Sequence, residues 1–85
     1  MTDNSTTPAL QALSELENGA VAVVEEVSIE ANGHLRRRLM EMGLVRGTRV
    51  RLVKRAPFGD PIELRVGAYS LTLRRDEACH VKVRR

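Results

Sequence analysis

One stretch, residues 35–47, constrains the fold most, because it predicts a short helix with a defined start and end. Three apolar residues recur at the spacing of one helical face: Leu35, Leu39 and Met42. Asn32 is a typical N-cap residue, and Gly43 stands where a left-handed residue commonly ends a helix. The apolar face of this helix must therefore pack on whatever the strands on either side of it build.

Alternating apolar residues predict short strands on both sides of this helix. The first, residues 20–27, contains adjacent valines and adjacent glutamates, so its alternation requires a bulge. Two turns are marked by the proline-rich segment 56–61 and by Gly67-Ala68, where glycine comes first as a type II′ turn prefers. The remaining strands are expected at residues 49–55, 62–66, 69–73 and 79–83. Tyr69 and Cys79 alternate in phase with apolar neighbours, which predicts that both are mostly buried.

The segment before the first strand has two interpretations. Thr7 as N-cap and Pro8 at the first helical position predict a short helix. Its apolar face would consist of Leu10, Leu13 and Leu16. In the alternative, Leu13 is already extended and only residues 14–16 form a turn.

A chain of 85 residues with a single cysteine makes one small domain without an internal disulfide. We expect residues 1–7 to form a flexible tail and residues 8–85 to form the domain. About five short strands and one or two short helices are too few for a two-layer sandwich, so a small, strongly bent, mainly β barrel is predicted. The sequence shows neither a signal peptide nor an apolar run of membrane-spanning length, which predicts a cytoplasmic protein.

The charge is unevenly distributed along the chain. Residues 1–30 hold six acids and no Lys or Arg, whereas residues 31–85 hold fourteen basic residues against five acids, a balance of +9. Twelve of the fourteen basic residues are Arg, which suits bidentate contact with carboxylates or phosphates. The basic half predicts either a solvated face or an acidic partner, a nucleic acid or a membrane surface.

No catalytic constellation is predicted, so the chain is not expected to be an enzyme. The paired carboxylates Glu25-Glu26 and Asp76-Glu77 point to opposite faces of a strand or lie in a solvated turn. A nucleic-acid interface is not favoured, because Phe58 and Tyr69 are the only aromatic residues on which bases would stack.

The sequence predicts no defined metal site, and we expect the protein to require no cofactor. Cys79 and His80 are neighbours on a predicted strand and would face opposite sides, while His34 lies near Glu30 at the start of the helix. These four residues are weak surface candidates for a divalent metal such as iron or zinc, which would then bridge two copies of the chain.

Several segments at fixed spacing resemble the ferrous iron transport protein A (FeoA) family. They are Leu35-Arg36-Arg37-Arg38-Leu39, Met42-Gly43-Leu44, Gly47, Ala56-Pro57-Phe58-Gly59-Asp60-Pro61-Ile62, and Leu71-Thr72-Leu73-Arg74-Arg75-Asp76-Glu77-Ala78. The resemblance runs from about Leu13 to Val83. It implies an SH3-like barrel with added helices, and a cytoplasmic accessory protein that docks on a ferrous iron permease with a cytosolic G-protein domain.

This docking protein would use the basic face of the helix and the proline-rich loop. The expected contact residues are Arg36, Arg37, Arg38, Arg46, Pro57, Phe58, Gly59, Asp60 and Pro61. The alternatives are plain solvated surfaces, a basic barrel that binds nucleic acid, or a metal-responsive homodimer.

Overall fold

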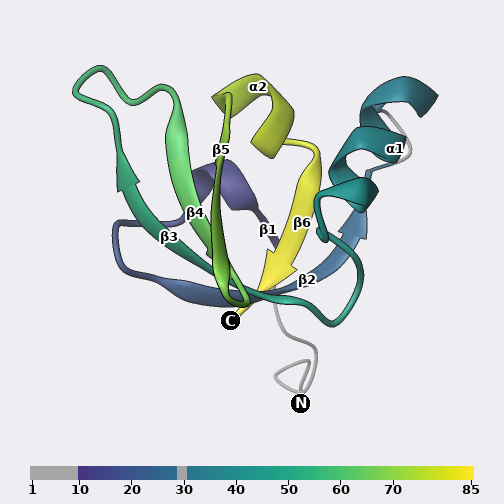
Figure 1. Ribbon diagram of the computed structural model, residues 1–85, viewed down its shortest axis with the longest axis horizontal. Coiled ribbons are helices and arrows are strands. Elements are labelled where there is room, and N and C mark those ends of the chain that lie inside the picture. The colour runs from purple at the N-terminus through teal and green to yellow at the C-terminus, as the bar shows by residue number, and fades with distance from the viewer. Residues whose placement is uncertain (1–9, 29–30) are drawn as a thin grey trace, which may run out of the picture.

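The computed structural model describes residues 10–28 and 31–85 of the chain (Figure 1). Strands predominate, and short helices lie between them. In chain order the elements are β1 (Gln11–Ala12), η2 (Leu13–Glu15), β2 (Val21–Val27), α1 (Gly33–Glu41), β3 (Arg49–Arg55), β4 (Ile62–Val66), β5 (Tyr69–Leu73), α2 (Arg75–Ala78) and β6 (Val81–Arg84). No helix in the described part of the chain is long and apolar enough to cross a membrane.

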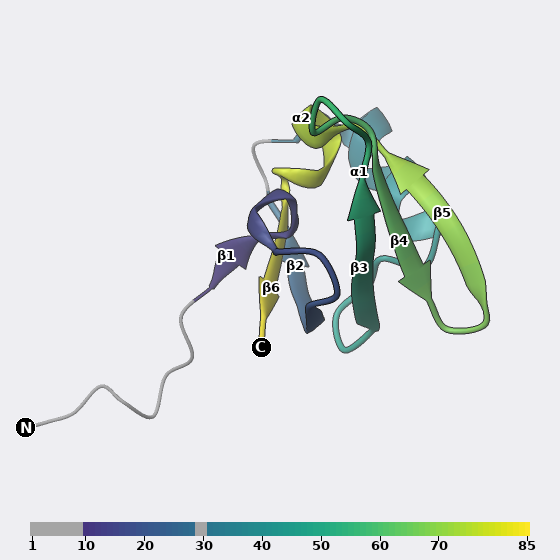
Figure 2. The same ribbon diagram turned by 90° about the vertical axis from the view of Figure 1, so that its left-hand side faces the viewer.

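The strands form one antiparallel sheet in the order β1-β6-β2-β3-β4-β5. The sheet bends sharply, so that β3, β4 and β5 rise on one side of α2 and β6 rises on the other (Figure 1). Turned by 90°, the molecule shows β3, β4 and β5 side by side, with the β3–β4 loop, α2 and α1 gathered at one end (Figure 2). The predicted mainly β, strongly bent architecture is confirmed, and the very short strand β1 is an addition to it.

The core is aliphatic, as the alternation predicted. Its buried residues are Leu13, Leu16, Ala22, Val24, Leu39, Leu44, Val50, Leu52, Ile62, Leu64, Val66, Leu73, Ala78, Val81 and Val83. None of the residues buried within the described ranges is polar or charged. Every polar or charged residue there is therefore at least partly exposed.

The bulge required in the first strand is present in β2. The pairing of β2 with β6 shifts register between Val24 and Glu26. The extra residue reconciles the adjacent valines and the adjacent glutamates with a single buried face. A second register shift, between Leu52 and Lys54 of β3, has no comparable signal in the sequence.

Helix α1 begins and ends as predicted. The Asn32 side chain accepts a hydrogen bond from the Leu35 amide at 2.8 Å, and Gly43 has φ +93° directly after the C-cap residue Met42. Leu39 is fully buried, while Leu35 and Met42 are half-buried against the core. The apolar face of the helix thus packs on the sheet.

The segment before β2 matches neither interpretation fully. Thr7 and Pro8 lie outside the described residues, and Leu10 is exposed, so a face shared by Leu10 and Leu13 is wrong. Leu13 starts a single 3₁₀ turn rather than continuing the strand. The Arg55 guanidinium holds this turn by donating to the carbonyl oxygens of Ser14, at 2.6 Å, and Leu16.

The predicted burial of Cys79 is wrong, because the chain is helical where a turn and a strand were expected. Residues 75–78 form α2, so Cys79 becomes its C-cap and is exposed, with its Sγ donating to the Asp76 carbonyl at 3.1 Å. Ala78 takes the buried position, and β6 begins only at Val81.

The predicted burial of Tyr69 is also wrong, although its alternation was placed correctly. Tyr69 begins β5, an edge strand, so its ring is 49% exposed. Its hydroxyl donates to the Met42 carbonyl oxygen at the end of α1. A Cβ atom added to Gly43 would lie 2.6 Å from that hydroxyl.

We expect Gly43→Ala to destabilise the protein by about 2–3 kcal/mol. The positive φ costs about 1–2 kcal/mol for a residue with a Cβ atom. Displacement of the Tyr69 hydroxyl would cost about 1 kcal/mol more. Gly19→Ala is the matched control, because Gly19 has φ +86° with nothing within 4 Å of an added Cβ. Equal losses of stability in a urea titration of both variants would contradict a role for the Tyr69 contact.

Candidate partner-docking surface

The loop between β3 and β4 holds an aromatic side chain out in solvent. Phe58 is 95% exposed, although it is a large apolar residue. Backbone hydrogen bonds close the loop beneath it, from the Gly59 amide to the Ala56 carbonyl at 2.7 Å and from the Ala56 amide to the Pro61 carbonyl at 3.0 Å. Phe58 is therefore presented on an ordered turn.

Gly59 allows this loop to turn, and Asp60 attaches it to the rest of the molecule. Gly59 has φ +85°, which residues with a Cβ atom rarely adopt. The Asp60 carboxylate accepts a hydrogen bond from the Arg75 amide at 3.0 Å, at the start of α2. The proline-rich loop thus has a direct connection to α2.

The outer face of α1 forms a second exposed surface, which we call the α1 hollow. Its volume is about 520 Å³. It is lined by Gly33, Arg36, Arg37, Met40, Glu41 and Val45. Met40 and Val45 are 52% and 42% exposed, and the predicted contact residues Arg36 and Arg37 flank them. An apolar centre with a charged rim is the usual anatomy of a protein interface.

Met40 and Val45 were not among the residues predicted for this surface. Met40 lies on α1 but falls outside the buried stripe of Leu35, Leu39 and Met42. That position was an available signal, because an apolar residue off the core face of a helix remains in solvent. Val45 follows the helix and had no comparable signal.

Arg38 does not extend freely into solvent from α1. Its Nη1 atom donates to Glu77 Oε2 of α2 at 2.9 Å. Arg46, beyond the helix, lies 3.5 Å from Glu25 Oε1, and the same carboxylate accepts from Arg84. Of the four predicted contact arginines, Arg36 and Arg37 have no ion pair within the described residues.

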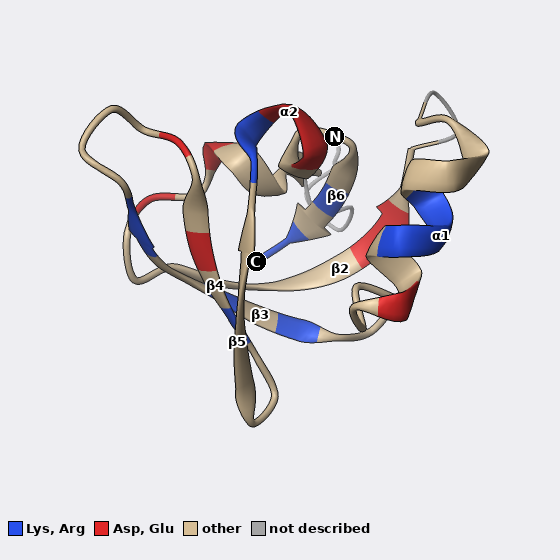
Figure 3. Ribbon diagram, turned by 45° about the horizontal axis from the view of Figure 1, so that its top comes forward, with Lys and Arg blue, Asp and Glu red and all other residues tan. Residues whose placement is uncertain are grey.

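Helix α2 lies between the two candidate surfaces and is tied to both. Its Glu77 accepts from Arg38 of α1 through Oε2 and from the Arg74 amide through Oε1, at 3.1 Å. The loop reaches the same helix through Asp60. Figure 3 shows the basic band of α1 and the mixed charges of α2 on this side of the molecule.

The loop and α1 therefore lie on the same side of the molecule as α2 but do not form a continuous patch. The loop and α1 stand at opposite ends of its long axis, with α2 between them (Figures 1 and 2). A partner that contacts both must extend across α2.

The pKa of the Glu77 carboxyl is lowered from its ordinary value of 4.5. The main cause is the hydrogen bond from the Arg74 amide, and the Arg38 guanidinium adds to it. Partial burial opposes these effects, because the Glu77 side chain is only 19% exposed. The carboxylate form is therefore the one that holds α1 and α2 together.

The described residues bring together no three metal-ligating side chains of the His, Cys, Asp and Glu types. Cys79 and His80 both precede β6, so the geometry of neighbours on a strand does not apply to them. His34 lies in the first turn of α1, and Glu30 lies outside the described residues. In the described ranges, these candidate ligands are therefore not assembled around one position.

Comparison with known proteins identifies the relatives of this chain. The profile of the FeoA domain matches residues 11–85. The chain is 41% identical over 71 residues, 84% of its length, to the Fe(2+) transport protein A/Fe(2+) transporter FeoB fusion protein of Porphyromonas gingivalis. It spans only 8% of the length of that fusion protein.

Two solved structures show the same fold. The FeoA-like protein of Clostridium acetobutylicum has a TM-score of 0.80 and 40% identity, over 91% of this chain and 86% of that one. FeoA of Stenotrophomonas maltophilia, a procaryotic SH3 domain protein solved with zinc, has a TM-score of 0.75 and 43% identity, over 86% and 88% of the two chains. The expected SH3-like barrel is confirmed.

We expect Glu77→Gln to destabilise the protein by about 1 kcal/mol at neutral pH, or roughly 4–8 °C in Tm. Because the folded-state pKa is lowered, this stabilisation is present above 4.5 and is lost as the pH falls through the lowered pKa. The difference in Tm between the two proteins should therefore shrink on acidification.

Glu41→Gln is the control for this pair, because Glu41 has no ion pair among the described residues and lies on the exposed side of α1. Its effect on Tm at neutral pH should be much smaller. A difference for Glu77→Gln that persists unchanged in acid would contradict the role of the charged carboxylate.

Proposed function

This chain belongs to the FeoA family, and from that membership we propose that it is a non-enzymatic cytoplasmic accessory of ferrous iron uptake. In this proposal it docks on the cytosolic, G-protein-containing part of a FeoB-type iron permease. The loop 56–61 and the α1 hollow make the contact. The protein then supports or regulates transport without a reaction of its own.

The fused relative supports this choice of partner. In the Porphyromonas gingivalis protein, transport protein A and transporter FeoB are one polypeptide. A covalent link keeps two domains at a high effective concentration. A separate chain must obtain the same association from its own contact surface, and this chain has two exposed apolar surfaces on the side that carries α2.

The observation that carries the proposal is the exposure of Phe58. Burial of a Phe side chain contributes about 1.5–3 kcal/mol. Because the loop is already closed by backbone hydrogen bonds and attached to α2 through Asp60, little conformational entropy would be lost on binding. An ordered, solvent-exposed aromatic residue is typical of an interface hot spot.

The α1 hollow supplies the second contact. Met40 and Val45 provide apolar area, and Arg36 and Arg37 provide cations without partners among the described residues. Rim charges of this kind chiefly raise the association rate and set its salt dependence. The two surfaces would therefore affect different rates: Phe58 would slow dissociation of the complex, and the two arginines would speed its association.

We expect Phe58→Ala to weaken binding to the isolated cytosolic part of the cognate permease about thirtyfold, corresponding to about 2 kcal/mol. The Tm of the Phe58→Ala variant should equal that of the parent, because Phe58 is 95% exposed. Arg36→Glu combined with Arg37→Glu should slow association, with a smaller effect at high salt. Surface plasmon resonance measures both rates.

Leu10→Ala is the matched control, since Leu10 is 49% exposed and lies beside β1, away from both surfaces. Its affinity should stay within about twofold of the parent. Unchanged affinity of Phe58→Ala would remove the loop from the interface. Repeating the titration with GDP and with a non-hydrolysable GTP analogue separates a regulator, whose affinity differs between states, from a scaffold.

Metal is the alternative basis for a function. The Stenotrophomonas maltophilia relative was solved with zinc. In this chain His34, Cys79 and His80 would supply surface ligands only between two copies, because the described residues contain no cluster of three. We therefore propose that iron or zinc is not a resident cofactor.

We expect the mass measured by light scattering to stay constant as zinc is titrated into the protein. The described residues contain no group of three metal-ligating side chains, whereas zinc sites in proteins usually have three or four protein ligands. We therefore expect no stable zinc bridge between two copies. A doubling of mass that Cys79→Ser or His80→Ala abolishes would instead establish the metal-responsive homodimer.

A further inference from the structure

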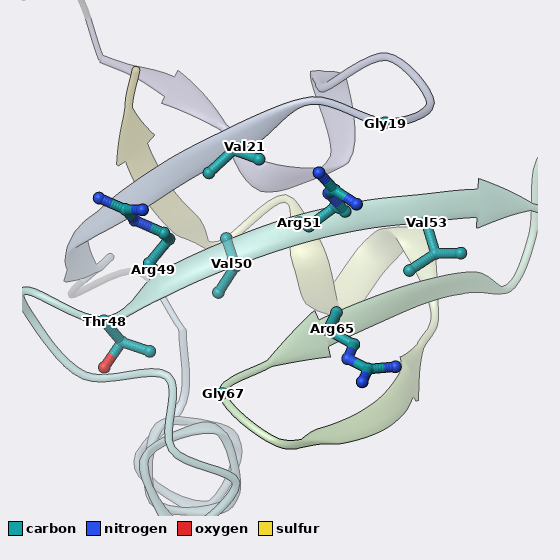
Figure 4. Close-up of a pocket in the computed structure, with 9 residues that line it drawn as sticks. All are labelled: Gly19, Val21, Thr48, Arg49, Val50, Arg51, Val53, Arg65 and Gly67. Atoms are coloured by element: carbon teal, nitrogen blue, oxygen red, sulfur yellow. The ribbon is translucent and has the colours of Figure 1, made fainter.

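The outer face of the sheet carries a hollow of about 790 Å³ whose charged lining is entirely basic (Figure 4). We call it the arginine hollow. Arg49 and Arg51 reach it from β3, and Arg65 reaches it from β4. Val21 and Val53 also line the hollow and are 39% and 36% exposed.

Strand register explains why these arginines gather there. Arg51 lies directly opposite Arg65 in the β3–β4 ladder and opposite Val21 in the β2–β3 ladder. Arg49 is two residues from Arg51, so both side chains project from the same face. Like charges directly opposite each other destabilise a sheet, so this arrangement carries a cost in the isolated chain.

No carboxylate within residues 10–28 and 31–85 forms an ion pair with any of the three arginines. Four other arginines in these ranges do have glutamate partners, whereas Arg36 and Arg37 of α1 also have none. The four are Arg38, Arg46, Arg84 and Arg85. Glu63, on the same strand as Arg65, lies opposite Lys54 and does not line the hollow.

We propose that the arginine hollow binds an acidic segment of a partner protein, with its carboxylates on Arg49, Arg51 and Arg65. Guanidinium groups bind carboxylates through paired, charge-assisted hydrogen bonds. Short aliphatic side chains of the segment would pack on Val21 and Val53. Occupation would also relieve the repulsion between Arg51 and Arg65.

The lining favours a peptide over other anions. None of its residues is aromatic, so the bases of a single-stranded nucleic acid would find no stacking surface. A recessed site with exposed valines suits an inserted side chain better than a flat layer of lipid headgroups. The hollow includes Gly67, which lies in the turn between β4 and β5, at the opposite end of β4 from the loop with Phe58, so the proposal is independent of the proposed permease docking.

The probe is a short synthetic peptide of alternating Glu and Val, titrated into the isotope-labelled protein and followed by heteronuclear NMR. We expect the largest shifts at residues 49–51 and 65. Arg51→Gln combined with Arg65→Gln should weaken the peptide about tenfold. Its Tm should not fall, because the substitution removes a like-charge pair.

Arg36→Gln combined with Arg37→Gln removes the same charge from α1 and is the matched control. Its peptide affinity should stay within about twofold of the parent. If both double variants lose the same peptide affinity, or if the chemical-shift changes centre on α1, the peptide responds to net charge alone and the proposal is wrong. Phosphatidylglycerol vesicles and a single-stranded oligonucleotide are tested in the same way. If either binds to the arginine hollow more tightly than the peptide does, the assignment to a peptide is wrong.

Discussion

A purely aliphatic core, closed without a disulfide, is the constraint on which the rest of this protein depends. Within the described ranges every buried residue is apolar, and the single cysteine is exposed. Such a small domain has little stability to spare. The charged and polar side chains of the described residues are therefore at least partly exposed, and several of them position the helices and loops over the core.

Glu77 shows how a few of these surface interactions organise a whole end of the molecule. Its two oxygens join the start of α2 to Arg38 of α1, while Asp60 joins the β3–β4 loop to the same helix. Helix α2 is only one turn long and would not form alone. It is held by Ala78 in the core and by these contacts, and in return it fixes the spacing between the loop and α1.

Sequence periodicity predicted the elements that bury a regular apolar face. It failed where an edge strand or a helix cap determines whether a side chain is buried. The strands at 49–55, 62–66 and 69–73 and the ends of α1 follow from alternation, Asn32 and Gly43. Tyr69 was misplaced because alternation assigns a face of the sheet but does not identify an edge strand. Cys79 was misplaced because Glu77 caps a helical turn that breaks the apparent strand. The sequence marks Met40 as lying off the buried stripe of α1, whereas the position of Val45 beside it follows only from the folded chain.

The fixed spacing across α2 bears on how a partner would be recognised. Rigid separation of Phe58 from the α1 hollow means that a partner must match two sites at one distance, which increases specificity beyond that of either contact. The arginine hollow includes Gly67, which lies in the turn between β4 and β5, at the opposite end of β4 from the loop with Phe58. A ligand there would contact β2, β3 and β4 without covering Phe58. Under the two proposals, the apolar contact and the cationic contact would occupy separate surfaces of one small barrel, and two different partners would bind at once.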